Sequence, residues 1–573
     1  MWDRFRLHPQ STTINPMPTS TDVGRAGPRH LVAASDVADV DDAIATGWAP
    51  ADLTKDWSAT LVTSAIAILP ALLLSQVPMV VALAIGAAIA CGLAYWADRT
   101  AAVPLVLSLV PATILANSGL MPAATYFLPT AILGLGVVLF AAARFVRTRS
   151  IPALPWRPLV AFAVLYLAAA VLSTAFSIRP ATSIPYLIGI VIILVVTLWL
   201  GPWVLSSSTR IASMFALIAA AGVVMTALSL VFSLTGPFQL FGRWIGVYLV
   251  EELTISNQAT GIVVLRTMGP FLAPGVQALA LAPAILATLA LRPGLGRRGR
   301  LVADLAVAVM VLGLLSTFAR AGWLAVVVGT GLLAIQQLRS RRIDLAAAAV
   351  CAVMAIAFGG LLMNVLGANY RPDLTVARIP LAGLIEAGSS DEGLLELLPA
   401  IPGALTPGGS PGALGTSTTP IHDRGGSELS GRLEIWSASV RAIEDRPVVG
   451  FGPGTNAIAL DPYLSGVSRR FVGLTSHNTW LRTWLEFGIF GIIGFAGFVV
   501  TALIAGLRGG STTPARRSLR MGALAIFAGL AAAQGFETFL LGGVSMPSFV
   551  WSIAAGLLAF GVGGIAARET AAA

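Results

Sequence analysis

The sequence predicts an all-α, polytopic membrane protein with about fourteen transmembrane helices. Of the 573 residues, 56% are apolar and only 11% are charged, and the mean hydropathy is +0.84. Soluble proteins carry about 25% charged residues, so this chain has too few charges to cover a surface that faces water. Apolar segments long enough to cross a bilayer recur along the chain, with arginines in the short connections between them. The net charge of +9 therefore indicates membrane orientation and argues against nucleic-acid binding.

The first 56 residues are polar and contain several prolines, and we expect a disordered cytoplasmic tail. An acidic stretch at 36–42 superficially resembles a metal-binding motif, but its composition favours a disordered tail. Cys91 and Cys351 both lie inside apolar segments. We interpret them as small core residues and not as a disulfide or a metal pair.

The apolar segments define the predicted transmembrane helices, because a spanning helix needs about 20 mostly apolar residues. Fourteen segments come close to this length, at 57–76, 78–97, 101–119, 124–143, 158–176, 183–203, 211–234, 274–291, 301–316, 321–338, 343–366, 487–507, 521–540 and 546–566.

The arginines predict the orientation of these helices. With a cytoplasmic N-terminus, the short inside connections hold 17 arginines, and the short outside connections hold two, Arg179 and Arg320. Cytoplasmic connections normally carry the excess of basic residues. We therefore expect both termini on the cytoplasmic side of the membrane.

Two predicted outside segments, 235–273 and 367–486, are too long to be simple connectors. Long loops in a compact protein are usually functional or disordered. The middle of the second segment, 402–426, is rich in Gly, Pro, Ser and Thr, which is typical of a flexible flap. After it, the pattern from Ser430 onward predicts an amphipathic helix. Its apolar stripe consists of Leu433, Trp436, Val440 and Ile443.

The region 430–491 contains a series of motifs in a fixed order. The predicted helix is followed by a Gly-Phe-Gly-Pro-Gly turn, then by Ser-His-Asn-Thr-Trp-Leu-Arg, and finally by Glu-Phe-Gly at the start of the twelfth span. In this order the sequence resembles the O-antigen ligase and O-antigen polymerase superfamily. The residues that carry the resemblance are Arg432, Gly450, Gly452, Gly454, His477, Asn478, Leu481, Glu486, Gly488 and Gly491.

Two arginines upstream also match the superfamily. Arg266 precedes the eighth span, and Arg320 lies in Phe-Ala-Arg-Ala-Gly at the outer start of the tenth. The superfamily usually has a serine where this chain has Ala319, so a hydroxyl contact is in doubt there. The resemblance covers 157–566, including the extracytoplasmic loop 367–486. It leaves 1–56 as a tail, 57–156 as transmembrane helices of unassigned role and 567–573 as a cytoplasmic tail.

The resemblance implies a GT-C-like helical bundle in the cytoplasmic membrane, with its site in an outward cavity. It implies an inverting glycosyltransferase that moves a glycan from a polyprenyl-diphosphate carrier, such as undecaprenyl diphosphate, to an acceptor hydroxyl on the outer face. The expected partners are this donor, a glycan or anchor acceptor and the lipid bilayer. No cofactor is implied, and whether the acceptor makes the protein a ligase or a polymerase stays open.

Arginines suit this chemistry, because negative charge grows on the departing diphosphate and a guanidinium presents a planar fork to phosphate oxygens. The expected diphosphate-binding residues are Arg266, Arg320, Arg432 and Arg441. No paired-Asp motif lies on the predicted outer face, so we expect metal-independent transfer. Alternatively, these arginines snorkel to the interface or bridge loops.

His477 is the one histidine of four that lies at a predicted helix start beside the membrane. Its imidazole can orient or deprotonate an acceptor hydroxyl, or donate to the diphosphate; the alternative is a capping or loop-anchoring role. We expect catalytic roles for His477, Arg320 and Arg432. The expected supporting residues are Asn478 to fix the loop, Glu486 to pair with an arginine, Gly452 and Gly454 for tight turns, and Trp480 in the interfacial aromatic belt or against a sugar.

The main alternative is a transporter or flippase for polysaccharide or lipid-linked glycan. Such proteins tend to show sequence repeats and ionisable residues at the membrane midplane. This sequence shows no repeat, and few charges lie deep in any predicted span. A membrane peptidoglycan polymerase is a second alternative, and the His-Asn motif argues against it.

Overall fold

The computed structural model describes residues 57, 60–65, 86, 102–117, 128–148, 154–235, 238–339, 347–357, 373–377, 428–464, 475–508 and 514–560, with gaps of one or two residues within some ranges. All of them belong to one compact unit, 44–573. The expected tail at 1–56 and flap at 402–426 lie outside the described residues.

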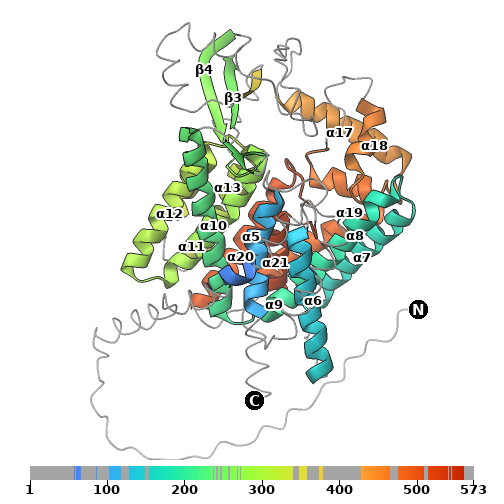
Figure 1. The fold of residues 1–573 in the computed structure, drawn as a ribbon, viewed down its shortest axis with the longest axis horizontal. Coiled ribbons are helices and arrows are strands. Elements are labelled where there is room, and N and C mark those ends of the chain that lie inside the picture. The colour runs from blue at the N-terminus through green and yellow to red at the C-terminus, as the bar shows by residue number, and fades with distance from the viewer. Residues whose placement is uncertain are drawn as a thin grey trace, which may run out of the picture. The chain divides into compact units, whose positions relative to one another are not determined.

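Helices dominate the described residues, and eleven of the predicted spans coincide with them (Figure 1). The helices are α5 (Ala102–Asn117), α6 (Leu128–Thr148), α7 (Arg157–Ala175), α8 (Pro180–Leu194), the π-helix η3 (Val195–Leu200), α9 (Gly201–Val204), α10 (Ser208–Thr235), α11 (Pro274–Leu291), the 3₁₀-helix η4 (Arg292–Gly294), α12 (Arg297–Leu315), α13 (Arg320–Arg339), α17 (Glu428–Asp445), α18 (Asn456–Leu464), α19 (Thr479–Arg508), α20 (Pro514–Ala533) and α21 (Met546–Phe560).

By length and hydropathy, six helical segments of the described residues can cross a membrane, and three shorter ones are also apolar. This agrees with a multi-pass helical membrane protein. The predicted spans 57–76 and 78–97, and much of 343–366, lie outside the described residues. The total of fourteen spans therefore stays a prediction.

The centre of the bundle is α11, which packs against α10, α13 and α20 and is buried over almost its whole length. Small residues permit this close packing. An added side chain at Gly322 of α13 would meet Ala278 of α11, and one at Gly522 of α20 would meet Ala290. Gly and Ala are the residues that let helices approach closely inside a bilayer. The outer helix α12 instead exposes large apolar side chains such as Leu305, as expected for a surface that faces lipid.

Helix α19 is divided by a break at Gly488, whose φ of +68° and ψ of −167° are not helical. The predicted twelfth span, 487–507, begins at this break. The preceding residues, Thr479–Phe487, form a short first part that packs on α17 and α18. The longer second part packs along α7.

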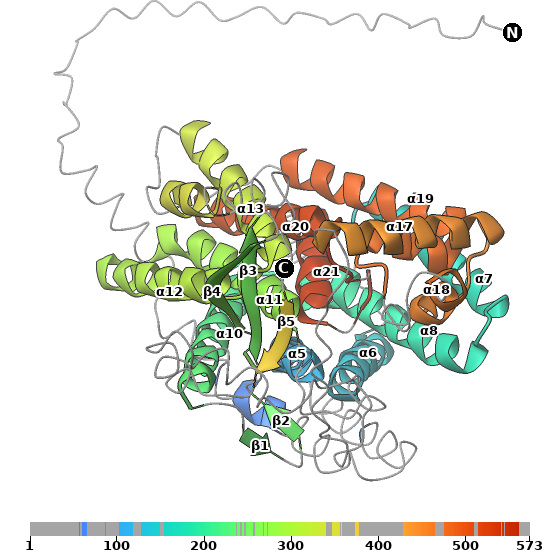
Figure 2. The same cartoon turned by 90° about the horizontal axis from the view of Figure 1, so that it is seen from above.

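The two long outside segments contain short strands, which the all-α prediction did not anticipate. Strands β1 (Phe238–Leu240) and β2 (Arg243–Ile245) form an antiparallel pair. Strands β3 (Tyr248–Ile255), β4 (Gln258–Thr267) and β5 (Asp373–Ala377) form an antiparallel sheet in the order β4-β3-β5. Figure 1 shows β3 and β4 at the same end of the helices as α17 and α18. Figure 2, seen from above, shows β3, β4 and β5 side by side.

Helix α17 is amphipathic as predicted, but its packed face differs from the predicted stripe. Leu433 and Val440 are 52% and 45% exposed, and Ile443 is buried. The packed face also contains Ile435, Ala438 and Ala442. These residues and Ile443 pack on α18 and α19, whereas Leu433 and Val440 of the predicted stripe are exposed.

Candidate functional site

Three charged or titratable side chains from separate elements meet at the end of the bundle where α11 begins. Arg432 comes from α17, His477 lies two residues before α19, and Glu537 follows α20. Arg432 Nη2 lies 3.6 Å from Glu537 Oε1, and His477 Nδ1 lies 3.7 Å from Glu537 Oε2. Arg432 Nη1 also donates to the carbonyl oxygen of Phe536. We call Arg432, His477 and Glu537 the Glu537 cluster.

The backbone around Glu537 is fixed to the start of α19. Thr479 Oγ1 donates to the Glu537 carbonyl at 2.9 Å, and Thr479 N–H donates to the Gln534 carbonyl at 2.9 Å. On the other side, an added side chain at Gly275, in the first turn of α11, would lie 2.8 Å from Glu537 Oε1. The carboxylate therefore lies at the positive end of the α11 dipole, and glycine provides the space for it.

His477 adopts a left-handed backbone conformation, with a φ of +45°. This conformation is uncommon outside glycine and costs about 1–3 kcal/mol, so it persists only where the surroundings impose it. Here Ser476 N–H donates to Asn456 Oδ1 at 3.0 Å, and Trp436 Nε1 donates to the Ser476 carbonyl at 2.9 Å. These bonds hold the residue before His477 on α17 and α18, and they fix where the imidazole emerges.

Asn478 caps α19. Its Oδ1 accepts the backbone N–H groups of Trp480 at 2.9 Å and Leu481 at 3.2 Å, which is the normal role of an N-cap asparagine. This agrees with the expected loop-fixing role. The Trp480 ring lies edge-on to Phe495, with centroids 4.9 Å apart, so it packs on the apolar core. Its predicted alternative role against a sugar stays a prediction.

Glu486 forms the expected pair with an arginine, which is Arg482. Arg482 Nε donates to Glu486 Oε1 at 2.8 Å, and Arg482 Nη2 donates to the Tyr186 hydroxyl at 3.2 Å. Glu486 is fully buried and also accepts Asn456 N–H at 3.3 Å. The pair joins α19 to α8 and α18.

The glycine-rich turn is tight, as predicted. The φ angles of Gly450, Gly452 and Gly454 are +68°, +107° and +75°. A side chain at Gly452 would clash with the hydroxyl groups of Ser177 and Ser183, and Ser183 Oγ donates to the Pro453 carbonyl at 2.9 Å. The Gly452 N–H donates to the Glu486 carbonyl at 3.0 Å. The turn is therefore held between the start of α8 and the break in α19.

Arg320 is the first residue of α13, at the same end of the bundle. Two residues before it, Phe318 also has a left-handed backbone conformation, with a φ of +49°. Gly322 packs on Ala278 of α11, only three residues from Gly275 beside Glu537. Arg320 therefore lies on a helix start adjacent to the one that supports the Glu537 cluster.

Arg266 lies in β4. The next residue, Thr267, is hydrogen-bonded to Ser316, four residues before Arg320. Thr267 N–H donates to the Ser316 carbonyl at 3.0 Å, and the Thr267 and Ser316 hydroxyls are 2.7 Å apart. The backbone of Arg266 is thus placed next to the segment that leads into α13. Its predicted binding of diphosphate stays a prediction.

Arg441 does not belong to the Glu537 cluster and instead contacts α18. Its Nη2 donates to the Tyr463 carbonyl at 3.2 Å, which joins α17 to α18. The Tyr463 hydroxyl donates to Asp445; burial and this hydrogen bond raise the pKa of Tyr463 to about 12, so the donor keeps its proton at neutral pH. The predicted role of Arg441 toward diphosphate stays untested, and its contacts favour a structural role.

Sequence reasoning did not identify Glu537, Gly275 or Arg482 as members of the site. A signal for Glu537 existed, because it is a carboxylate at the outer end of a predicted span, where few charges occur. Within the described part of the chain, no group of three or more His, Cys, Asp and Glu side chains is arranged to hold a metal ion.

Comparison with known families matches the central part of the chain. The family model described as O-Antigen ligase matches residues 305–496, about a third of the sequence. The match includes Arg320, Arg432, the glycine-rich turn and His477, and it ends before Glu537. It confirms the predicted resemblance. No curated protein matches the chain.

Proposed function

We propose, from the premise that this multi-pass membrane protein carries an O-antigen ligase domain, that it transfers a glycan from a polyprenyl-diphosphate carrier to an acceptor hydroxyl. The site would face the outer side of the cytoplasmic membrane, with both termini inside. The observation that carries the proposal is the Glu537 cluster, which places a guanidinium and an imidazole 3.6 Å and 3.7 Å from one carboxylate. Arg432 and His477 of this cluster lie in the segment that matches the family, 305–496.

In the proposed reaction, the acceptor oxygen attacks the anomeric carbon on the face opposite the diphosphate. The bond from that carbon to the diphosphate oxygen breaks, so the configuration inverts and polyprenyl diphosphate departs. Arg432 and Arg320 stabilise the charge that develops on the leaving oxygens, because fixed cations lower the barrier where charge grows. We propose that these arginines serve in place of a metal ion.

His477 takes the proton of the acceptor hydroxyl. Its Nδ1 faces the carboxylate of Glu537, which favours the tautomer with the proton on Nδ1 and leaves Nε2 as the base. Glu537 then stabilises the imidazolium that forms. The His477 side chain is 38% exposed and that of Arg432 is 25% exposed, so a substrate can reach both groups.

The test uses purified protein with a polyprenyl-diphosphate glycan and an acceptor. We expect release of polyprenyl diphosphate in the presence of EDTA. His477→Ala should lower the rate about 10²–10⁴-fold, as for loss of a general base, and His477→Asn or His477→Gln should be similarly impaired. If the amide variants stay largely active, the imidazole has a structural role.

Two further outcomes separate the alternatives. Intact donor that crosses the bilayer would support a flippase and contradict glycan transfer. Loss of activity with EDTA and recovery with a divalent ion would contradict the arginine mechanism but leave the reaction class in place. The length of the glycan product distinguishes polymerase from ligase, because only a polymerase adds repeats to a lipid-linked acceptor.

A further inference from the structure

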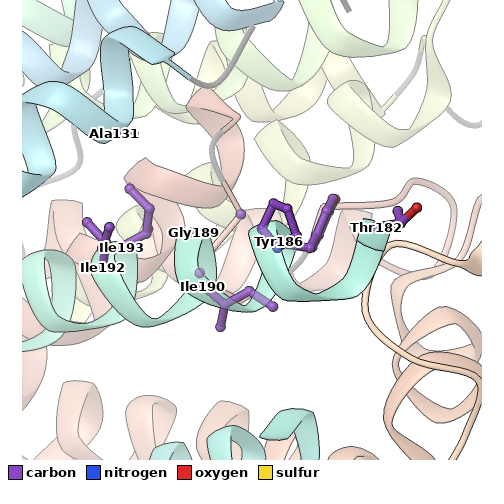
Figure 3. A pocket seen from close by; sticks show the side chains of 10 residues that line it. Ala131, Thr182, Tyr186, Gly189, Ile190, Ile192 and Ile193 are labelled. Carbon is purple, nitrogen blue, oxygen red and sulfur yellow. The ribbon is translucent and has the colours of Figure 1, made fainter. Parts of the chain in front are cut away.

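An apolar pocket of about 240 Å³ lies along one face of α8. Its α8 lining follows helical spacing from Thr182 through Tyr186 and Gly189 to Ile193, and Figure 3 shows this row of residues. At the rise of an α-helix, this row is about 16 Å long. Ala131 of α6 and the turn at Gly542 and Gly543 form the opposite walls. No charged side chain lines the pocket, so it suits a hydrocarbon chain.

The polar end of the pocket adjoins Arg482 and the glycine-rich turn. The Tyr186 hydroxyl accepts from Arg482, and the ring of Tyr186 lies against Gly454 of the glycine-rich turn. The wall at Gly542 belongs to the same connection between α20 and α21 that carries Glu537. Gly542 has a φ of +76°, and an added side chain there would lie 3.0 Å from Ile190, so the turn packs closely on α8.

The orientation of the pocket matches that of an amphiphile in a membrane. Thr182 and Tyr186 lie toward the start of α8, which is predicted to be its outer end, and Ile192 and Ile193 lie deeper along the helix (Figure 3). Pro185 is exposed on the membrane-spanning helix, so the pocket can be entered sideways from the lipid. A chain with its polar group at the outer face would run inward along α8.

We propose that this pocket binds the first part of the prenyl chain of the diphosphate donor, and this proposal rests on the proposed function. The chemistry of the substrates favours the donor over the acceptor. In the donor, the chain is esterified directly to the diphosphate, so it must begin beside the groups that bind the diphosphate. In an acceptor lipid, a headgroup separates the apolar chains from the reacting hydroxyl.

Gly189 provides a specific test, because an added side chain there meets nothing within 4 Å. Gly189→Leu should fill the pocket without a clash, and leucine is the better helix former. With a long polyprenyl donor, we expect KM to rise about tenfold or more at unchanged kcat. This result indicates loss of a binding contact that is equally strong in the ground state and in the transition state. With a dimethylallyl-diphosphate donor of the same glycan, KM should not change, because that chain is too short to reach Gly189.

The matched control is Gly331→Leu in α13, where an added side chain also meets nothing within 4 Å. If Gly189→Leu uses the long donor as well as this control does, the chain does not occupy the pocket. Equal losses on the long and short donors would also contradict the proposal, because they would indicate a distorted site.

A binding measurement separates this proposal from the proposed function. Polyprenyl diphosphate with a photoreactive group in its chain, and no sugar, should label peptides from 180–194 in the wild type and label them less in Gly189→Leu. Excess polyprenyl diphosphate should compete, and phosphatidylglycerol should not. Competition by the phospholipid would indicate a general lipid site and overturn the proposal. Labelling of α8 without any glycan transfer would overturn only the proposed function, and transfer with labelling elsewhere would overturn only the chain pocket.

Discussion

At the scale of single residues, Glu537 links the two groups to which we assign the chemistry. It lies within 3.7 Å of both Arg432 and His477. Because Gly275 has no side chain, the carboxylate can lie against the first turn of α11, at the positive end of the helix dipole. A carboxylate in this position can orient an imidazole and stabilise its charged form during proton transfer, and it also restrains the guanidinium.

Glu537→Gln should therefore lower glycan transfer by roughly 10²–10⁴-fold, the range expected when an amide replaces the carboxylate that orients a catalytic histidine. The amide is nearly the same size, so the amount of folded protein should not change. Initial rates with saturating donor measure the effect, and Glu444→Gln on the exposed side of α17 is the control. A Glu537→Gln rate close to that control would show that the carboxylate does not act through His477.

Arg320 carries a prediction about geometry as well as charge. Arg320→Ala should abolish transfer in a protein that still inserts in the membrane, and Arg320→Lys should remain badly impaired, because an ammonium lacks the bidentate fork of the guanidinium. Arg339→Ala, at the other end of the same helix, should have near-normal activity. Near-normal turnover by Arg320→Lys would mean that the position supplies only general positive charge or only structure.

The residues of the site were partly predictable from sequence. His477, Arg432 and Asn478 could be found because they belong to a motif of fixed order, and the structure places the first two in one cluster. Glu537 lies 60 residues further along, in a connection without a motif of its own. Its proximity depends on how α20 packs against α11 and α13, and no local pattern reports that packing.

At the scale of elements, the site depends on two backbone features that only glycine can form without strain. They are the turn at 450–454 and the break in α19. The break at Gly488 is the more demanding, because a side chain there would clash with the backbone of Val448. Its φ of +68° with a ψ of −167° also lies in a region that is open essentially only to glycine.

Gly488→Ala should lower both transfer activity and thermal stability, since forcing such a conformation costs about 1–3 kcal/mol and the clash adds to it. Gly331→Ala, in an open helical position, should keep full activity and a melting temperature at or slightly above that of the wild type. Both quantities can be compared in the same detergent. Equal melting temperatures for the two variants would mean that the break tolerates a side chain.

Helices were predictable from hydropathy because a bilayer requires long apolar segments. The strands were not predicted. Strand β5 pairs with β3 although more than a hundred residues separate them, and no local pattern reports such a pairing. Strands β3 and β4 are neighbours in the sequence and pair with each other, but the polar segment that contains them was interpreted only as a long loop. The predicted apolar stripe of α17 differs from its packed face for a related reason. Spacing indicates an apolar face, but the neighbouring helices decide which residues are covered.

At the scale of the whole molecule, the prediction concerns orientation. A cysteine-free protein carrying Ser417→Cys in the flap should react with an impermeant thiol reagent added to intact cells, and Ser511→Cys in a predicted inside connection should react only after permeabilisation. The arginine distribution and the positive-inside rule give this expectation. The reverse labelling pattern would place the Glu537 cluster on the cytoplasmic side and contradict the proposed site.

The break in α19 has a mechanical consequence. The first part of α19, before Gly488, is hydrogen-bonded to the connection that carries Glu537 and to α8, whereas the longer second part packs along α7. A bilayer that thins or thickens makes spanning helices tilt. Because the two parts are held by different partners, we expect the position of His477 to depend on the contacts of the first part and not on the tilt of the second.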